Sequence, residues 1–314
     1  MNSFGQTFRL TTFGESHGPA IGGIIDGCPA NMALDFNEVG NELARRSPAG
    51  KTGTSPRREP DEVEWLSGLT LTPDRGPVTL GTPIAFLIRN RDTRSHDYDA
   101  LKDLFRPGHG DYTWQQKYGI RDPRGGGRCS ARETAARVVA GAIAKQILRE
   151  KGIAISSSTE CECPDDGNTH GGIVRCTATG LPVGVGSPLF DRLQSQLAAA
   201  MMSIPSATGF EVGEGFRAAT MTGREYMDRW NPDFSTQTNH CGGIMGGLSN
   251  GMPVTFRVAF HPVVTQPHNL PCVDAEGNEH ILDKVDGRHD LCHVPRAAAV
   301  VEAMTAIVLV DAML

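Results

Sequence analysis

Residues 119–133 read GIRDPRGGGRCSARE and lead directly into the clearest helix of the sequence. Ser130 and Glu133 have the spacing of a capping box, and Gly152 supplies a stop, so the sequence predicts a helix from Ser130 to Lys151. Apolar residues recur at the helical period along this segment, which indicates a face packed on the core. These residues are Val138, Val139, Ala142, Ile143 and Ile147.

Other segments define the class of the fold. Helices are expected at Asp35–Arg46, at Asp191–Ser203 and at Pro295–Leu314, the last being apolar nearly all round and therefore buried. Short strands are expected at Val78–Arg89 and at Val254–Ala259. Because the strands do not alternate regularly with the helices, the pattern favours an α+β fold over a doubly wound sheet.

Length and composition narrow the possible classes of protein. The 314 residues suit one large domain or two fused halves, and 39% hydrophobic with 21% charged residues excludes a disordered chain. There is no run of about 18 apolar residues and no apolar leader near Met1, so we expect a cytoplasmic protein without a membrane segment. The net charge of −6 argues against nucleic-acid binding.

One internal similarity suggests a repeat. Residues 22–29 and 246–253 share the pattern G-G-x-x-x-G-x-P, and each follows a histidine. This predicts a single domain over residues 1–314 with two related halves, near 1–155 and 170–314. Chance similarity between two glycine-rich turns is the alternative.

Arginine dominates the basic residues: 24 of the 30 are Arg, and eight of these lie between Arg89 and Arg132. The rigid guanidinium fork suits carboxylates and phosphates. Arg124, Arg128 and Arg132 flank the three glycines 125–127 at the start of the helix, where backbone amides attract anions. The segment therefore predicts a site for a small polyanion, with ion-paired surface arginines as the alternative.

Two other patterns point to chemistry only weakly. Residues 14–18, GESHG, fit the G-x-S-x-G elbow of serine hydrolases, but Pro19 and two further glycines follow, so no helix begins and we reject that elbow. A serine and a histidine on a glycine-rich loop remain. The eight cysteines include no C-x-x-C pair, so we expect reduced, partly buried thiols and no metal site.

Taken together, four motifs resemble the signatures of the chorismate synthase family and occur in that family's order. They are residues 14–18 (GESHG), 106–113 (RPGHGDYT), 128–134 (RCSARET) and 287–290 (GRHD). The resemblance runs from Phe4 to Leu314. It implies a β-α-β sandwich with internal pseudo-two-fold symmetry and a homotetramer.

The resemblance also implies a reaction. The family is a group of carbon–oxygen lyases acting on phosphates: 5-enolpyruvylshikimate 3-phosphate loses phosphate in a 1,4-anti elimination that gives chorismate, the last common step of the shikimate pathway to the aromatic amino acids. Reduced FMN is required but not consumed, which makes the protein a flavoprotein with NADP and an external flavin reductase as the source of electrons. The substrate, with two carboxylates and a phosphate, is the small polyanion that the arginines predict.

Roles follow residue by residue from the motifs. His17 corresponds to the histidine that protonates the departing phosphate, His109 to the one that balances charge on the reduced flavin, and Asp290 to the group that, with Ser130, helps to deprotonate flavin N5. Substrate contacts are implied for Ser16, Arg46, Arg106 and Arg132. Cofactor contacts are implied for Arg128, Cys129, Ser130, Pro205, Ser206, Gly246, His261, Pro262, Val263, Val264, Thr265 and Arg288.

The chain also departs from the family pattern. The family's Lys-Pro-x-x-Ser/Thr reads HPVVT at residues 261–265, and its Arg-Arg-Arg-Pro-Gly reads RRSPA at residues 45–49. A helical insertion around residues 161–167 is nearly absent, and the usual extension past Leu314 is missing. The alternative function is therefore a relative that binds FMN or the phosphate ester with weak or no turnover.

Overall fold

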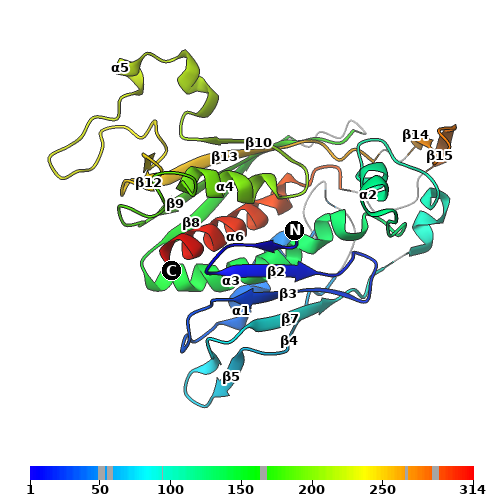
Figure 1. Cartoon of the computed structure of the whole chain (residues 1–314), viewed down its shortest axis with the longest axis horizontal. Coiled ribbons are helices and arrows are strands. Elements are labelled where there is room, and N and C mark those ends of the chain that lie inside the picture. The colour runs from blue at the N-terminus through cyan, green and yellow to red at the C-terminus, as the bar shows by residue number, and fades with distance from the viewer. Residues whose placement is uncertain (49–53, 55–58, 94, 163–167, 266–267, 285–289) are drawn as a thin grey trace.

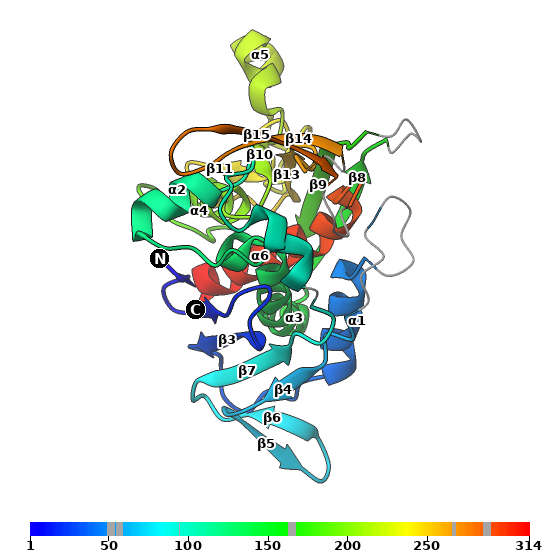
Figure 2. The same cartoon turned by 90° about the vertical axis from the view of Figure 1, so that its right-hand side faces the viewer.

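A layer of helices lies between two antiparallel sheets, as Figures 1 and 2 show from two sides. The computed structural model describes residues 1–48, 54, 59–93, 95–162, 168–265, 268–284 and 290–314. The three layers confirm the expected α+β class and the β-α-β sandwich. No helix among these described residues is long and apolar enough to cross a membrane.

The first sheet comes from the N-terminal part of the chain and has the order β1-β2-β3-β7-β4. Its outer face is solvated and its inner face is apolar, so burial alternates along β7, where Ile84, Phe86 and Ile88 are buried. A hairpin of β5 and β6 extends it. The bounds are β1 Ser3–Phe4, β2 Arg9–Phe13, β3 Ala20–Asp26, β4 Val63–Trp65, β5 Leu69–Thr72, β6 Gly76–Thr79 and β7 Ile84–Arg89.

The second sheet has the order β10-β13-β9-β8 and shows the same alternation, with every second residue of β13 buried from Val254 to Phe260. Two hairpins stand beside it, β11 with β12 and β14 with β15. The bounds are β8 Ala154–Glu160, β9 Gly172–Thr179, β10 Ala207–Val212, β11 Ile244–Met245, β12 Leu248–Ser249, β13 Val254–Phe260, β14 His268–Val273 and β15 Glu279–Lys284.

The helical layer holds the core. It consists of α1 (Phe36–Arg46), α3 (Thr134–Glu150), α4 (Leu193–Met202) and α6 (Val294–Met313), close to the helices predicted from the sequence. Helices α3 and α6 approach so closely at Gly141 that a Cβ there would lie 2.3 Å from the Cβ of Ala303. The shorter helices are α2 (Asp111–Tyr118), α5 (Gly223–Tyr226), η1 (Ser95–Leu101), η2 (Gly127–Cys129), η3 (Ala131–Glu133) and η4 (Gly215–Thr220).

Two expected boundaries were wrong. The helix predicted from Ser130 starts at Thr134, because residues 131–133 tighten into the 3₁₀ turn η3 and the Ser130 hydroxyl accepts from the amide of Arg132 at 3.3 Å instead of completing a capping box. The single strand expected over Val78–Arg89 is broken between β6 and β7. Gly81, with φ of +77°, and Pro83 interrupt it.

The repeated glycine pattern occupies different structures in its two copies. Gly22 and Gly23 lie inside β3, where a Cβ on Gly23 would meet the ring of Phe86 at 2.8 Å. Gly246 and Gly247 instead form the tight turn between β11 and β12, with positive φ angles. The pattern by itself marks no structural repeat, and the division into halves near 1–155 and 170–314 stays a prediction.

The N-terminal segment is fastened to the C-terminal helix. The backbone amides of Gln6, Thr7 and Phe8 donate to the carboxylate of Asp311 on α6 at 2.9, 2.7 and 2.9 Å. Three amides around one carboxylate make a strong, charge-assisted contact. It fixes the first strands of one sheet to a helix of the central layer.

Candidate active site

A cavity of about 890 Å³ gathers most of the predicted site residues at one end of the molecule, near α2. Most of its lining comes from five segments, within residues 106–111, 121–131, 205–206, 261–265 and 290–293, and Glu15, Tyr98, Trp114 and Ile120 complete it. Of the residues named from the sequence, the lining includes Arg106, His109, Arg128, Cys129, Ser130, Pro205, Ser206, His261, Val263, Val264, Thr265 and Asp290.

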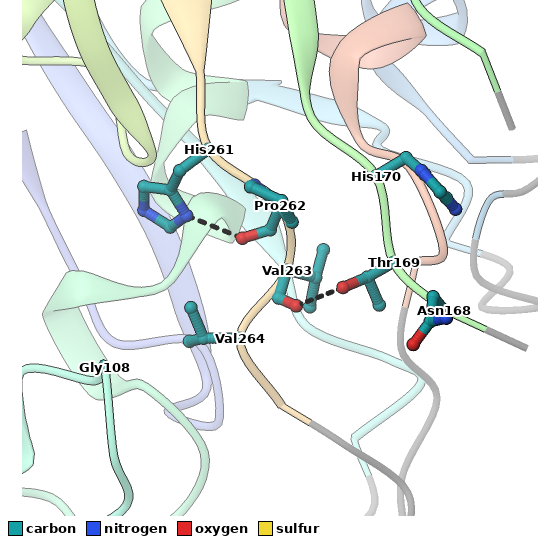
Figure 3. Close-up of a pocket in the computed structure, with 8 residues that line it drawn as sticks. All are labelled: Gly108, Asn168, Thr169, His170, His261, Pro262, Val263 and Val264. Atoms are coloured by element: carbon teal, nitrogen blue, oxygen red, sulfur yellow. Dashed lines mark hydrogen bonds between the residues drawn. The ribbon is translucent and has the colours of Figure 1, made fainter.

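A second cavity of about 770 Å³ adjoins the first and shares Gly108, His261, Val263 and Val264 with it. Figure 3 shows residues 261–264 facing residues 168–170 across this space, with the ring of His261 turned away from His170. The Thr169 hydroxyl donates to the carbonyl of Val263 at 2.6 Å, and Nδ1 of His261 lies 2.6 Å from the carbonyl of Pro262. The segment 261–265 is therefore held as a wall between the two spaces.

His109 and Thr265, predicted from separate motifs, meet directly. The Nε2 atom of His109 lies 2.7 Å from the Thr265 hydroxyl, and Thr265 is almost fully buried. His109 sits in the turn before α2, and Gly108 beside it has φ of +70° and packs against Val264. The contact fixes the orientation of the imidazole in the cavity wall.

Arg106 is buried and held rigidly by the first residue of α2. Its Nε and Nη2 atoms donate to the two carboxylate oxygens of Asp111 at 2.8 and 2.9 Å, and Nη2 also donates to the carbonyl of Gly125 at 3.1 Å. Burial acts to raise the pKa of Asp111, but the Arg106 hydrogen bonds outweigh it and lower that pKa. The pair stays ionised and ties α2 to the glycine loop.

The loop 14–18 places His17 against that glycine loop. The amide of Ser16 donates to the carbonyl of Gly127 at 3.2 Å, and a Cβ on Gly125 would lie 3.1 Å from the His17 ring. The ring of Tyr98 packs edge-on against His17 with centroids 5.0 Å apart. The chain then enters β3, not a helix, which confirms that residues 14–18 form no hydrolase elbow.

Asp122 provides a negative charge near His17. Partial burial acts to raise the pKa of Asp122, but hydrogen bonds from Arg124 and the nearby charge of His17 bring it below the usual range. Arg124 donates to both carboxylate oxygens, at 2.9 and 3.0 Å. The carboxylate is therefore ionised near neutral pH.

Asn90, at the end of β7, connects the loop of His17 to Arg132. Its Nδ2 donates to the carbonyls of Glu15 and Gly18 at 3.0 and 2.9 Å, while its Oδ1 accepts from Nε of Arg132 at 3.0 Å. Sequence reasoning missed this residue, because a single asparagine after a strand carries no distinctive pattern. The amide determines where both Ser16 and His17 lie.

Arg46 and Arg132, both predicted to contact substrate, form a buried cluster with Asp61. Arg46 Nη1 lies 3.4 Å from one Asp61 oxygen and Arg132 Nη1 pairs with the other, and all three side chains are about 4% exposed. Arg46 also donates to the Thr134 hydroxyl at 3.0 Å. Neither arginine is in the cavity lining, whereas Ser130 and Ala131, which precede Arg132 in the chain, are.

Three buried donors around the glycine loop make no hydrogen bond among the described residues, although one of them, Arg128 Nη1, lies 3.8 Å from a carboxylate oxygen of Glu133. They are the Ser16 hydroxyl, Nη1 of Arg128 and Nη2 of Arg132. Arg128 Nη2, by contrast, donates to the carbonyl of Thr12 at 2.8 Å and is fixed in place. A buried donor that makes no hydrogen bond destabilises the folded protein unless a ligand supplies the acceptor. These three donors can therefore bind an anion.

Asp290 and His293 face the cavity from the loop before α6. Nη1 of Arg296 donates to Asp290 at 2.6 Å, and the Arg296 Nε donates to the carbonyl of Arg46 at 3.0 Å. Burial lowers the pKa of His293, helped by His261 and Arg296 and opposed by Asp290, so its imidazole is neutral. Sequence reasoning missed His293, although its position three residues after Asp290 was a usable signal.

Several predicted residues lie elsewhere. Gly246 is in the β11–β12 turn, and Figure 1 shows β12 toward the opposite end of the molecule from α2. Arg288 falls outside the described residues.

Burial keeps several of the described cysteines as protonated thiols. Cys129 lines the cavity, and burial raises its thiol pKa, while Cys28 and Cys176 are buried with thiol pKa values of about 12. Among the residues described, no cluster of His, Cys, Asp or Glu could hold a metal ion.

A family model, curated relatives and a solved structure all point to the same protein family. The family model described as chorismate synthase matches residues 8–161 and 161–314. Proteins named chorismate synthase from Christiangramia forsetii and Parabacteroides distasonis are each 47% identical, the first over 99% of this chain and 96% of its own length, the second over 100% and 98%. A crystal structure of a chorismate synthase superimposes with a TM-score of 0.74 at 31% identity, covering 98% of this chain and 92% of that one.

Proposed function

The chain belongs to the chorismate synthase family and is a lyase, and from this premise we propose that it converts 5-enolpyruvylshikimate 3-phosphate into chorismate and inorganic phosphate by a 1,4-anti elimination that requires reduced FMN. We further propose that the chain acts in the cytoplasm as a homotetramer and that an external NADP-linked reductase supplies the reduced flavin.

The observation that carries this proposal is the group of buried donors at the glycine loop that make no hydrogen bond among the described residues: the Ser16 hydroxyl, Arg128 Nη1 and Arg132 Nη2. A substrate with two carboxylates and a phosphate supplies the missing acceptors. Most of the guanidinium charge nearby is already matched by Asp61, Asp111, Asp122 and Glu133. The site therefore recognises a polyanion through positioned donors more than through excess positive charge.

The residues around the cavity fit FMN. The segment 261–265 lies between two connected spaces of about 890 and 770 Å³, and a cavity of this order accommodates a cofactor beside a small substrate. His109, fixed by Thr265, offers an imidazole to the reduced ring, and His261, Thr265 and the backbone between them are placed to bind the cofactor phosphate. When bound, reduced FMN lends electron density to the departure of the allylic phosphate and recovers it.

Protein groups then handle the protons. His17 lies at the glycine loop near the ionised Asp122 and is assigned to donate a proton to the departing phosphate. Asp290 and Ser130 line the cavity and are assigned to accept the proton released on the flavin side. Arg106, Arg128 and Arg132 are held by fixed partners, so the donors need little rearrangement when the substrate binds.

An anaerobic assay with pre-reduced FMN and the phosphate ester tests the proposal. Chorismate and phosphate should form in equal amounts over many turnovers per flavin, with the flavin still reduced at the end. Stoichiometric flavin oxidation would contradict the mechanism, and FMN binding without product would identify a binding-only relative. His261 in place of the family's lysine is the observation that favours this second outcome, and flavin fluorescence titration separates binding from turnover.

A further inference from the structure

Glu133 is a buried carboxylate to which the proposed reaction assigns no role. It ends the 3₁₀ turn η3 and directly precedes α3, and its side chain is 7% exposed. Residues 128–131 line the larger cavity, whereas Glu133 does not. Any role of this carboxylate toward a bound molecule therefore has to act through one of its neighbours.

Two arginines flank this carboxylate. Its Oε1 atom lies 2.7 Å from Nη2 of Arg137, one turn further along α3, and its Oε2 atom lies 3.8 Å from Nη1 of Arg128. Neither carboxylate oxygen makes a hydrogen bond among the described residues, and Nη1 of Arg128 makes none there either. A buried acceptor and a buried donor thus lie close together without forming the hydrogen bond between them.

The gap between Arg128 and Glu133 stays open because each side chain is held from its other side. Nη1 of Arg137 donates to the Ser203 hydroxyl at 2.7 Å, which ties Arg137 and the carboxylate beside it to the end of α4. Nη2 of Arg128 donates to the carbonyl of Thr12 at 2.8 Å and also contacts the Thr12 hydroxyl. The two anchors keep the arginine and the carboxylate at the distance of an ion pair without a hydrogen bond.

This geometry has two effects on Arg128. Its Nη1 donor stays available to an anion in the cavity, because Glu133 does not accept from it. The guanidinium charge is nevertheless balanced by a carboxylate 3.8 Å away, and such a pair interacts strongly where water is scarce. An anion at Arg128 therefore gains a directed hydrogen bond but little attraction from net charge.

We propose that Glu133 is a positioning residue that limits how tightly Arg128 binds an anion, and that Arg137 holds Glu133 where it does this without occupying the Arg128 donor. The purpose of this arrangement rests on the proposed function. The elimination releases phosphate, and an arginine without a balancing carboxylate would retain that anion. Binding energy that substrate and product share equally does not raise kcat, so weaker binding of phosphate favours turnover.

A purely structural role of Glu133 leads to a different expectation. Acidic residues at the start of a helix stabilise its N-terminus, and Glu133 and Arg137 have the i, i+4 spacing of a helical ion pair. Loss of these interactions would lower the free energy of unfolding and leave the affinity for anions as it is. Anion affinity, measured separately from stability, therefore distinguishes the two roles.

The first test measures the binding of inorganic phosphate by isothermal titration calorimetry at constant pH and ionic strength. Glu133→Gln keeps the shape of the side chain but removes its charge. The dissociation constant should fall about tenfold, the scale of one charge acting at short range in a partly buried site. Glu38→Gln is the matched control, because Glu38 also pairs with a residue of α3, Arg149, but lines neither of the two connected cavities. This control should bind phosphate as the wild type does.

The second test changes the other partner of Glu133 and expects the opposite sign. In Arg137→Met the carboxylate is released and can accept from Nη1 of Arg128, so phosphate should bind more weakly than to the wild type. Arg149→Met removes the same charge elsewhere on α3 and should leave the affinity unchanged. Equal or weaker phosphate binding by Glu133→Gln, or tighter binding by Arg137→Met, would overturn the proposal.

The anaerobic assay separates this inference from the proposed function. Where chorismate forms, added phosphate should inhibit Glu133→Gln at lower concentrations than it inhibits the wild type, in proportion to the change in the dissociation constant. Equal inhibition of the two enzymes would contradict the role in phosphate release. A wild type that forms no chorismate would refute the proposed function, and the calorimetric comparison would still decide whether Glu133 limits anion affinity.

Discussion

The side chains of the candidate site fall into two groups, those that take part in the reaction and those that hold other residues in position. His17 and His109 lie on different loops, one against Gly125 and one against Thr265, and neither belongs to the core. We expect His17→Ala and His109→Ala each to slow turnover at least about a hundredfold, the usual scale for a lost acid or base. FMN binding and melting temperature should stay at the wild-type values.

The matched control for these variants is His280→Ala, which removes an exposed histidine whose partner, Asp274, lies outside the cavity. Its turnover under anaerobic conditions should equal that of the wild type. Near-normal turnover of His17→Ala would remove His17 from the role of proton donor.

Asn90 is a positioning residue in the same region, because one amide holds the carbonyls of Glu15 and Gly18 and the Nε of Arg132. In Asn90→Ala the loop of His17 loses its anchor, so kcat should fall about tenfold to a hundredfold while KM changes less. Asn90→Asp keeps the acceptor for Arg132 and should recover part of the loss.

Ser67→Ala serves as the comparison, since the Ser67 hydroxyl also makes two contacts, to Pro83 and Ala85, in the same sheet. Both variants should lose similar stability in urea, and only the Asn90 variant should lose kcat. Equal kcat in the two would reduce Asn90 to a purely structural role.

At the scale of elements, the crossing of α3 and α6 determines how closely the central layer packs. Gly141 is helical, and alanine is about 1 kcal/mol better than glycine inside a helix. A Cβ at Gly141 would nevertheless lie 2.3 Å from that of Ala303 and 2.8 Å from its carbonyl oxygen. Gly141→Ala should therefore destabilise the protein by about 1–3 kcal/mol in urea unfolding, as overpacked cores do.

Gly40 on α1 provides the opposite case, since a Cβ there meets nothing within 4 Å. Gly40→Ala should raise stability by up to about 1 kcal/mol through helix propensity alone. The prediction fails if the two substitutions change the unfolding free energy in the same direction.

The sequence predicted helices and strands better than it predicted the candidate site. The apolar period of 138–147 and the uninterrupted apolar stretch after Pro295 identified α3 and α6, because core packing imposes those patterns directly. The start of α3 and the break at Gly81 were not predicted, because both depend on a local backbone geometry that has no distinctive sequence pattern.

The candidate site was only partly accessible to the same reasoning. Motifs named Arg106, His109, Arg128 and Thr265, which do meet at one cavity. They gave no indication of Asp61 or Asn90, which come from other segments and join the site only when the sheet and the helical layer assemble. Placement of Gly246 in a distant turn likewise needed the three-dimensional fold.

At the scale of the whole molecule, a buried ionic cluster joins the layers. Glu302 on α6 is 2% exposed and pairs with Arg45 of α1, Lys145 of α3 and Ser157 of β8. Burial acts to raise the pKa of Glu302, but these partners together lower it to about 2. One carboxylate thus connects the helical layer to the second sheet.

Folding lowers the pKa of Glu302. The ionised carboxylate therefore stabilises the folded protein at pH values above the pKa of glutamate in the unfolded chain, about 4.3, and this stabilisation is lost as the pH falls toward 2. The shift corresponds to about 3 kcal/mol at neutral pH. Glu302→Gln should lose about that much stability at pH 7 and show a weaker decline between pH 5 and pH 2.5. Urea unfolding at several pH values checks this.

Glu64→Gln is the control for Glu302→Gln, because Glu64 pairs with Arg89 on the solvent side of the first sheet. Water screens such a pair, so its loss should leave stability nearly unchanged across the same pH series. A Glu302→Gln profile parallel to that of the wild type would show that the cluster contributes no pH-dependent stability.

The clasp of Asp311 on residues 6–8 has a consequence for how the protein is made. A ribosome releases the first sheet long before it synthesises α6, yet α6 supplies both the carboxylate for those amides and the surface on which α3 packs. The N-terminal half of the nascent chain therefore cannot finish folding before the C-terminal half is synthesised, as it does in proteins built from successive domains. Until the last helix emerges, the apolar side of α3 lacks the surface that covers it in the folded protein.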